Sequence, residues 1–274
     1  MKTIIIPTDF SEISNNAAFY AADMAYAIHA NMILAHVVSI PMALSEVAIP
    51  PETIDMMMLD ATKSINQLKS QLEQRTKNSV RVSAVVRMGD FIEEITELAE
   101  QSDLFAIIMG IQGTGAAERM LLGSNALKAI HKMPYPVIII PDGVCYTAIK
   151  NVALACNMHD VSDTIPVKNI EALANTFSCK LHVIYISKQG KKMNTDVLPE
   201  SLSVQNNLMS LKPQIHFLEN EHVEAGILEF VQKEKMDLLL MVPERRNFIS
   251  ALFHRSMSNE VALTAHLPIM NIHT

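Results

Sequence analysis

Glycines gather in one short stretch of this chain. Four of its eight glycines lie between residues 110 and 123, where Gly110, Gly113 and Gly123 are followed by Ser124 and Asn125. The stretch begins where an apolar run ends and finishes where a helical pattern begins. Glycine lets the backbone approach a ligand closely, and the free N–H groups and dipole of a helix start attract anions. These residues therefore predict a phosphate-binding loop.

Two familiar phosphate motifs do not describe this stretch, and a structural alternative to binding exists. The stretch lacks the Gly-Lys-Ser/Thr of a P-loop and the GxGxxG spacing of dinucleotide-binding folds. On glycine content alone, a surface loop in which Ser124 simply caps the next helix is an equal alternative. Asp9 after the first apolar run has a similar alternative, as a helix N-cap or turn residue, and Ser11 can also cap the following helix.

The elements that must position these residues occur twice in the chain. The repeated runs are 4–9 with 152–157, 32–38 with 180–186, 103–109 with 237–242, and 136–140 with 268–272. The first two pairs share an offset of 148 and the later pairs a smaller one, so the second copy is shorter in its middle. We expect two domains, 1–146 and 147–274.

Within each copy, short apolar runs alternate with helical patterns such as 17–29, 51–77 and 167–177. The strands expected in the first copy are 2–7, 31–38, 80–86, 104–109 and 136–140. Continuous apolar runs are typical of strands buried on both faces, and alternation with helices implies right-handed crossovers and a parallel sheet. The predicted fold is α/β, with two tandem, doubly wound, five-stranded parallel-sheet domains of Rossmann-like type.

Bulk composition excludes several classes of protein. The net charge of −7 argues against a general nucleic-acid binder, which needs a basic face. No apolar stretch approaches the length of a membrane span, and the apolar run near the N-terminus is too short for a secretory signal. Three cysteines in no zinc-binding pattern indicate free thiols. We expect a soluble, cytoplasmic protein with neither nucleic acid nor membrane as a partner.

A set of motifs spread over the chain resembles those of one known family. The pattern Gly110-x2-Gly113-x9-Gly123-Ser124 resembles the ATP-binding signature of the universal stress protein family. The segment 7–11 after the first strand, Met109-Gly110 at the end of the fourth, and Pro-Val-Ile-Ile-Ile-Pro at 136–141 agree with it. The resemblance covers nearly the whole chain as a tandem pair, and it implies the fold of the adenine nucleotide α-hydrolases.

The resemblance implies how the adenosine of ATP would be held. Asp9 would hydrogen-bond the adenosine, chiefly its ribose, and Pro7 and Thr8 would line that pocket. Val37, after the second strand, and Met109 would contact the adenine.

For the phosphates, the resemblance implies contacts from Gly110, Gly113, Gly123, Ser124 and Asn125. Asn125 departs from the family pattern, in which a small or β-branched residue is frequent at this position. ATP normally arrives with Mg²⁺, but no second carboxylate near the loop supplies an evident metal site, so we assign no metal ligand.

The second copy has lost this chemistry. At the positions that match Asp9 and the three signature glycines it carries Asn157, Pro243, Arg246 and Arg255. Proline removes a backbone donor, and arginine side chains fill the space that phosphate would share with backbone amides. We therefore expect only the first copy to bind ATP in the family manner.

Three classes of function remain. The resemblance favours an ATP-binding regulatory protein of the stress response, which signals to an unknown protein partner. The alternatives are a slow ATPase on the same fold and an interaction module that binds no nucleotide. We do not expect an enzyme, because neither a G-x-S-x-G elbow nor an HExxH pair is present. His36 and His182 occupy the same place in both copies, which favours a repeated packing or hydrogen-bonding role over catalysis.

Assembly follows from the same resemblance. Members of the family usually dimerise through antiparallel pairing of their fifth strands. The resemblance implies that 136–140 pairs with 268–272 inside one chain, which would form a pseudo-dimer and protect both sheet edges. Association of two such chains into a homodimer stays open.

Overall fold

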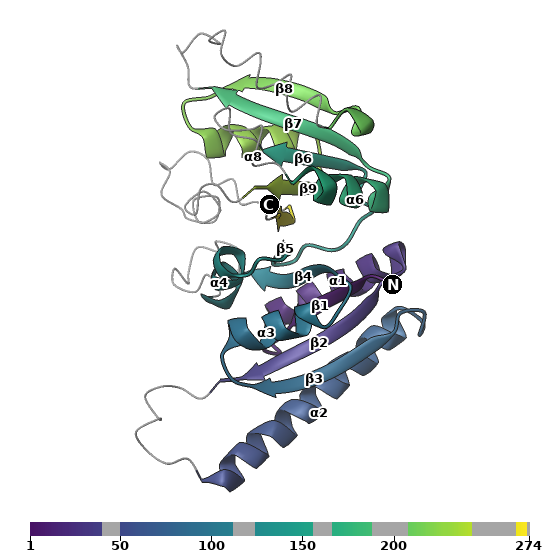
Figure 1. Ribbon diagram of the computed structural model, residues 1–274, viewed down its shortest axis with the longest axis vertical. Coiled ribbons are helices and arrows are strands. Elements are labelled where there is room, and N and C mark those ends of the chain that lie inside the picture. The colour runs from purple at the N-terminus through teal and green to yellow at the C-terminus, as the bar shows by residue number, and fades with distance from the viewer. Residues whose placement is uncertain (40–49, 112–123, 156–165, 188–207, 243–266, 273–274) are drawn as a thin grey trace. The chain divides into compact units, whose positions relative to one another are not determined.

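Strands and helices alternate along both halves of the chain, as the apolar runs predict. A computed structural model describes residues 1–39, 50–111, 124–155, 166–187, 208–242 and 267–272 (Figure 1). Its described residues divide into two units, the first ending at Tyr146 and the second beginning at Thr147. No described helix has both the length and the apolar character needed to cross a bilayer.

Unit 1 is a parallel sheet with helices between its strands. Its elements are β1 (Thr3–Pro7), α1 (Glu12–Ile28), β2 (Asn31–Val38), α2 (Pro51–Arg75), β3 (Val82–Met88), α3 (Phe91–Glu100), β4 (Leu104–Ile111), α4 (Ser124–Lys132) and β5 (Val137–Pro141). The strand order is β3-β2-β1-β4-β5, and every neighbouring pair is parallel. The chain therefore winds outward from β1 to β3 and then returns to lay β4 on the other side of β1.

Unit 2 repeats this topology. Its elements are β6 (Asn151–Ala155), α6 (Val167–Phe177), β7 (Lys180–Ser187), a 3₁₀ turn η2 (Met209–Leu211), β8 (Gln214–Glu219), α8 (Val223–Lys233), β9 (Leu238–Met241) and β10 (Ile269–Asn271). The strand order β8-β7-β6-β9-β10, parallel throughout, is the order of unit 1 in the second copy's numbering. The expected α/β fold in two tandem, doubly wound copies is confirmed.

Reversal of the winding direction places helices on both faces of the unit 1 sheet. Because parallel crossovers are right-handed, α1 and α2 cover one face, and α3 and α4 cover the other. In agreement, α1 packs against α2 and α3 packs against α4. The buried face of α1 is rich in alanine, which allows the helix to approach the sheet closely. Its buried alanines are Ala17, Ala18, Ala21, Ala22 and Ala25.

Several element boundaries differ from the sequence prediction, and three of the differences have evident local reasons. β3 runs over 82–88 rather than 80–86, because its register pairs Met32 with Val82. α1 begins at Glu12, before the expected Ala17, because Ser11 caps it. α2 ends at Arg75 rather than at residue 77, where the backbone has already turned to positive φ.

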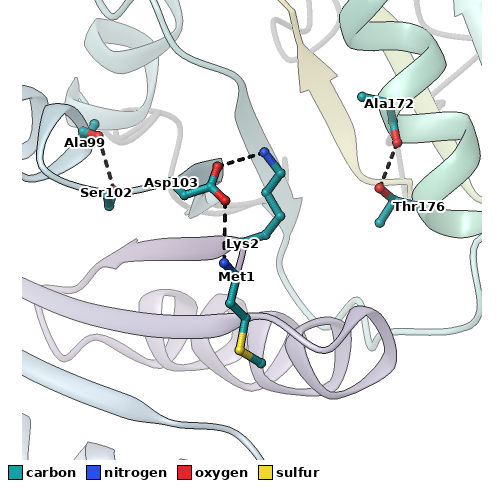
Figure 2. A network of polar contacts seen from close by, with 7 residues as sticks. All are labelled: Met1, Lys2, Ala99, Ser102, Asp103, Ala172 and Thr176. Carbon is teal, nitrogen blue, oxygen red and sulfur yellow. Dashed lines mark hydrogen bonds and ion pairs between the residues drawn. The ribbon is translucent and has the colours of Figure 1, made fainter.

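In each unit, an aspartate before the fourth strand is tied to the start of the first strand. The Asp103 carboxylate accepts a 2.8 Å hydrogen bond from Lys2 Nζ and lies 3.7 Å from the amino group of Met1 (Figure 2). The hydrogen bond from Lys2 lowers the pKa of Asp103. In unit 2, Asp237 Oδ2 accepts the backbone N–H groups of residues 150 and 151, both at 2.8 Å. These contacts join the two strands between which the sheet changes its winding direction.

Candidate functional site

The carboxyl ends of β1 and β4 mark the point in unit 1 where the sheet changes its winding direction. β1 ends at Pro7 and its neighbour β4 ends at Ile111. β2 ends at this same edge, since Pro7 pairs with Ala35 and Val37 follows two positions later. In open α/β sheets, ligands bind beyond the carboxyl ends of the strands at such a switch point. This edge is therefore the candidate site.

The turn that follows β1 is held by hydrogen bonds within the protein. The Thr8 N–H donates to the Ala35 carbonyl at 2.9 Å, and the Thr8 hydroxyl accepts the Phe10 N–H at 3.0 Å. The same hydroxyl lies 3.1 Å from Ser14 Oγ, and Thr8 is buried. Pro7, just before it, is buried as the last residue of β1. The Thr8 side chain therefore builds the turn, and this contribution accompanies any role in lining a pocket.

Asp9 brings a negative charge to this edge. Its Oδ1 accepts both the backbone N–H of Ser11, at 3.0 Å, and the Ser11 hydroxyl, at 2.6 Å. Desolvation by burial raises the pKa of Asp9, but the hydrogen bonds from Ser11 and Ser14 outweigh it and hold the pKa below its ordinary value. The side chain is exposed, and both hydrogen bonds from Ser11 fall on the same oxygen, Oδ1. Asp9 thus offers an ionised oxygen that can accept hydrogen bonds from a ligand.

The same geometry also supports the alternative in which Asp9 is a residue of the turn. Ser11 is the N-cap of α1, because its Oγ accepts the Ser14 N–H at 3.2 Å. Asp9 in turn accepts from Ser11, so the carboxylate supports the helix cap with one oxygen. The two interpretations are therefore compatible, because an exposed carboxylate can support the cap and still accept hydrogen bonds from a ligand.

The two side chains expected to contact adenine differ in exposure. Val37 on β2 is half-buried, and it lies beside Arg87 of β3. Met109 on β4 is only 7% exposed and belongs to the core of the unit. Val37 therefore offers more apolar surface to a ligand than Met109 does.

Close packing requires glycine at position 110, and the sequence did not reveal this constraint. A Cβ at this position would lie 2.5 Å from the carbonyl oxygen of Ile13 and 2.7 Å from its Cγ2. The close approach of α1 to β4 therefore demands glycine whether or not a ligand binds.

The remaining signature residues are only partly described. Gly113 and Gly123 lie outside the described residues. Ser124 is the first residue of α4, but its side chain is not described, and Asn125 is exposed in the first turn of that helix. Within the described ranges, no three His, Cys, Asp or Glu side chains form a group that could hold a metal ion.

Two aromatic rings support the turn, and the sequence pointed to only one of them, His36. His36 Nδ1 lies 2.8 Å from the Thr8 carbonyl oxygen, and the His36 ring stacks on Phe10 at 4.6 Å between centroids. This is the hydrogen-bonding and packing role expected for His36. Its counterpart His182 instead places Nδ1 3.0 Å from His216 Nε2. The repeat of histidine in both copies was the available signal for His36, whereas nothing in the sequence marked Phe10.

The groups at this edge are chemically suited to a nucleoside phosphate. The Asp9 carboxylate suits ribose hydroxyls, Val37 offers apolar contact, and the N-terminus of α1 lies beside the turn. Helix N-termini favour anions such as phosphate.

Comparison with known proteins identifies the family and the fold of the chain. The profile of the universal stress protein family matches residues 1–141. A universal stress protein of Methanocaldococcus jannaschii is 30% identical over 141 residues, which cover 51% of this chain and 81% of that protein. One from Methanothermobacter thermautotrophicus is 26% identical over 143 residues, which cover 51% of this chain and 94% of the relative.

Solved structures resemble the chain over both units. A universal stress protein from Archaeoglobus fulgidus has a TM-score of 0.69 at 17% identity and is matched over 99% of this chain and 96% of its own. A putative universal stress protein from Pseudomonas aeruginosa has a TM-score of 0.57 at 13% identity, with 99% and 93% covered. At these identities the likeness concerns the fold, and it extends to the second unit, which the family profile does not reach.

Proposed function

This chain belongs to the universal stress protein family, and we propose that its first unit binds ATP at the carboxyl edge of β1 and β4. The observation that carries the proposal is the Asp9 carboxylate. It is exposed at the switch point of the sheet, and its pKa is held below its ordinary value. An ionised acceptor at this position is suited to the hydroxyl groups of a ribose.

The proposed contacts divide by the part of the nucleotide that they hold. Asp9 accepts the ribose hydroxyls, and the backbone amides of the loop before α4 hold the phosphates. The full set of proposed contact residues is Pro7, Thr8, Asp9, Val37, Met109, Gly110, Gly113, Gly123, Ser124 and Asn125. A Mg²⁺ ion that accompanies ATP would be held by phosphate oxygens and water rather than by a protein cage.

The second unit is proposed not to bind ATP in this manner. Asn157 replaces the aspartate, and Pro243, Arg246 and Arg255 replace the three signature glycines. These four positions lie outside the described residues, so the support for this part of the proposal is the chemistry of the substitutions. Asparagine lacks the negative charge, and proline lacks the backbone N–H that a phosphate needs.

The proposed role is regulatory. A ligand that binds only the folded unit stabilises it by about 2.7 kcal/mol at a concentration of 100 times Kd. An unknown protein partner would then respond to the loaded form. The competing functions are slow ATP hydrolysis on the same fold and partner binding without a nucleotide, and one set of measurements separates all three.

The decisive experiment combines native mass spectrometry with thermal unfolding. We expect a co-purifying adenine nucleotide, and a rise in unfolding temperature with ATP but not with GTP. Asp9→Asn gives unit 1 the residue of the second copy and retains an acceptor for Ser11. This variant and Gly123→Arg should abolish the shift, while Asn157→Ala should preserve it as the matched control.

Two outcomes favour the other functions. Phosphate release above the blank that disappears in Gly113→Arg would support an ATPase. The absence of any nucleotide from the purified protein, together with no thermal shift in the wild type, would refute ATP binding and leave the interaction module.

A further inference from the structure

The backbone at Phe10 adopts a conformation that its side chain disfavours. Its φ is 65°, in the left-handed region where glycine and asparagine are ordinarily found. A bulky residue in such a conformation costs about 1–3 kcal/mol and persists only when neighbouring groups fix it. The turn from Thr8 to Phe10 therefore needs anchors, and Asp9 lies at its centre.

Side chains from α1 and β2 supply these anchors. From α1, Asn15 Nδ2 donates to the Phe10 carbonyl at 3.3 Å, and Ser14 Oγ lies 3.1 Å from the Thr8 hydroxyl. From β2, His36 contacts both ends of the turn, through the Thr8 carbonyl and through the Phe10 ring. Thr8 and Phe10 are the residues on either side of Asp9 in the chain.

The tautomer of His36 follows from its partner. A backbone carbonyl can only accept a hydrogen bond, so Nδ1 of His36 carries the proton that is shared with Thr8. The ring packs on Phe10 at an interplanar angle of 28°, which is a stacked arrangement. His36 thus combines a donor and a flat apolar face, and substitutions can remove these two features separately.

We propose that His36 is a positioning residue of the nucleotide site, which fixes the Thr8–Phe10 turn and thereby aims the Asp9 carboxylate at the ribose. This inference rests on the proposed function. His36 acts through the residues on either side of Asp9, because it hydrogen-bonds the Thr8 carbonyl and stacks on the Phe10 ring.

The second copy contains a matched control. His182 has the same place in its own copy, on β7, but its Nδ1 is engaged with His216 of the adjacent strand β8. Replacing His182 removes a histidine hydrogen bond of similar length, 3.0 Å against 2.8 Å, from a unit proposed not to bind ATP.

The test separates the donor of His36 from its ring. His36→Ala removes both features, His36→Asn retains a donor near the position of Nδ1, and His36→Phe retains the stacking. By isothermal titration calorimetry, we expect His36→Ala to weaken ATP binding about tenfold, which corresponds to 1.4 kcal/mol. The Asn and Phe variants should each recover part of this loss, and His182→Ala should leave the Kd for ATP unchanged.

A second measurement needs no nucleotide. In the free protein, we expect His36→Ala to raise the carboxyl pKa of Asp9 toward its ordinary value, measured by NMR titration, because the Ser11 hydrogen bonds loosen with the turn. The amide hydrogens of Phe10 and Ser11 should exchange faster in this variant, whereas those of β4 should not. Unchanged exchange in β4 also shows that the unit remains folded.

The outcomes distinguish this proposal from the one on which it rests. If the wild type binds ATP and His36→Ala binds it equally well with an unaltered Asp9 pKa, then the positioning role is wrong. If the wild type fails to bind ATP, the nucleotide proposal is wrong, and the Asp9 pKa and the exchange rates still decide whether His36 fixes the turn. An equal loss of ATP affinity in His182→Ala would also overturn the positioning role, because it would indicate a general effect on stability.

Discussion

At the scale of single residues, Gly110 shows how a binding motif and a packing constraint can coincide. The resemblance assigns Gly110 to the phosphates, while the structure places the carbonyl oxygen of Ile13 2.5 Å from where its Cβ would be. The contacting atom belongs to the backbone of a capped helix, so it cannot simply rotate away. Glycine at this position therefore contributes to folding as well as to the proposed binding.

This dual role predicts that Gly110→Ala destabilises the protein. Overpacking a close contact costs about 1–3 kcal/mol, because the backbone of α1 or β4 has to move. Urea unfolding measures the loss. Gly143→Ala is a reference without overpacking, since among the described residues no atom beyond its chain neighbours lies within 4 Å of its Cβ. Its φ of 73° still adds the left-handed penalty of about 1–2 kcal/mol. A Gly110→Ala variant with wild-type ATP affinity and stability would refute both roles of this residue.

Some residues of the candidate site could be predicted from the sequence and others could not. Asp9 and Gly110 follow apolar runs, so the expected topology alone brings them to one edge of the sheet. The contact of His36 with Thr8 depends on the register in which β1 pairs with β2. A positive φ at Phe10 is contrary to the local preference of an aromatic residue, so it had to come from the tertiary structure.

At the scale of elements, α1 and α3 begin with similar caps that differ in what lies beside them. Ser11 caps α1 and also donates to Asp9, whereas the Asp90 carboxylate caps α3 by accepting the N–H groups of Ile92 and Glu93. Only the first of these caps is joined to the candidate site. The pair therefore allows helix capping to be separated from ligand binding.

We predict that Ser11→Ala and Asp90→Ala each lower stability by about 0.5–2 kcal/mol, the usual contribution of an N-cap. Only Ser11→Ala should also weaken ATP binding, because it removes both hydrogen bonds that the Ser11 hydroxyl makes at the turn. Urea unfolding and calorimetry with ATP on both variants provide the comparison. Equal effects of the two substitutions on ATP affinity would show that the cap matters only for folding.

Element boundaries were predictable where a hydrophobic pattern alone sets them. The ranges 31–38 and 167–177 agree with β2 and α6. Boundaries set by pairing or capping were missed, as at β3, whose residues are fixed by the register with β2. Val80 illustrates the reason, because it is buried like a strand residue yet lies before the strand begins.

At the scale of the whole molecule, the two units share a topology but engage their repeated histidine differently. His182 in unit 2 is 8% exposed, and its Nε2 has no hydrogen-bond partner among the described residues. Burial lowers the pKa of His182 first, and the positive charges of His216 and Lys180 lower it further against the opposing effect of Glu234. Protonation of this histidine is therefore disfavoured in the folded state.

The sign of this shift predicts acid sensitivity in unit 2. Below pH 6.5, the unfolded chain takes up a proton that the folded unit resists, so stability should fall as the pH decreases and level off below the folded pKa. Hydrogen exchange of β7 and β8, corrected for intrinsic rates, measures this at several pH values. His182→Phe should flatten the dependence, and an equally steep profile in that variant would contradict the assignment to His182.

The oligomeric state of the protein tests whether the fifth strands of the two units pair within one chain. Within its unit, β5 is the last strand beyond β4, and β10 is the last strand beyond β9. An open edge promotes pairing between chains, and the family resemblance implies that 136–140 and 268–272 satisfy each other within one chain. We therefore predict that the protein sediments as a 30.4 kDa monomer at micromolar concentration. A species of twice that mass which persists on dilution would contradict this prediction, because an internal pair leaves neither fifth strand free to recruit a second copy.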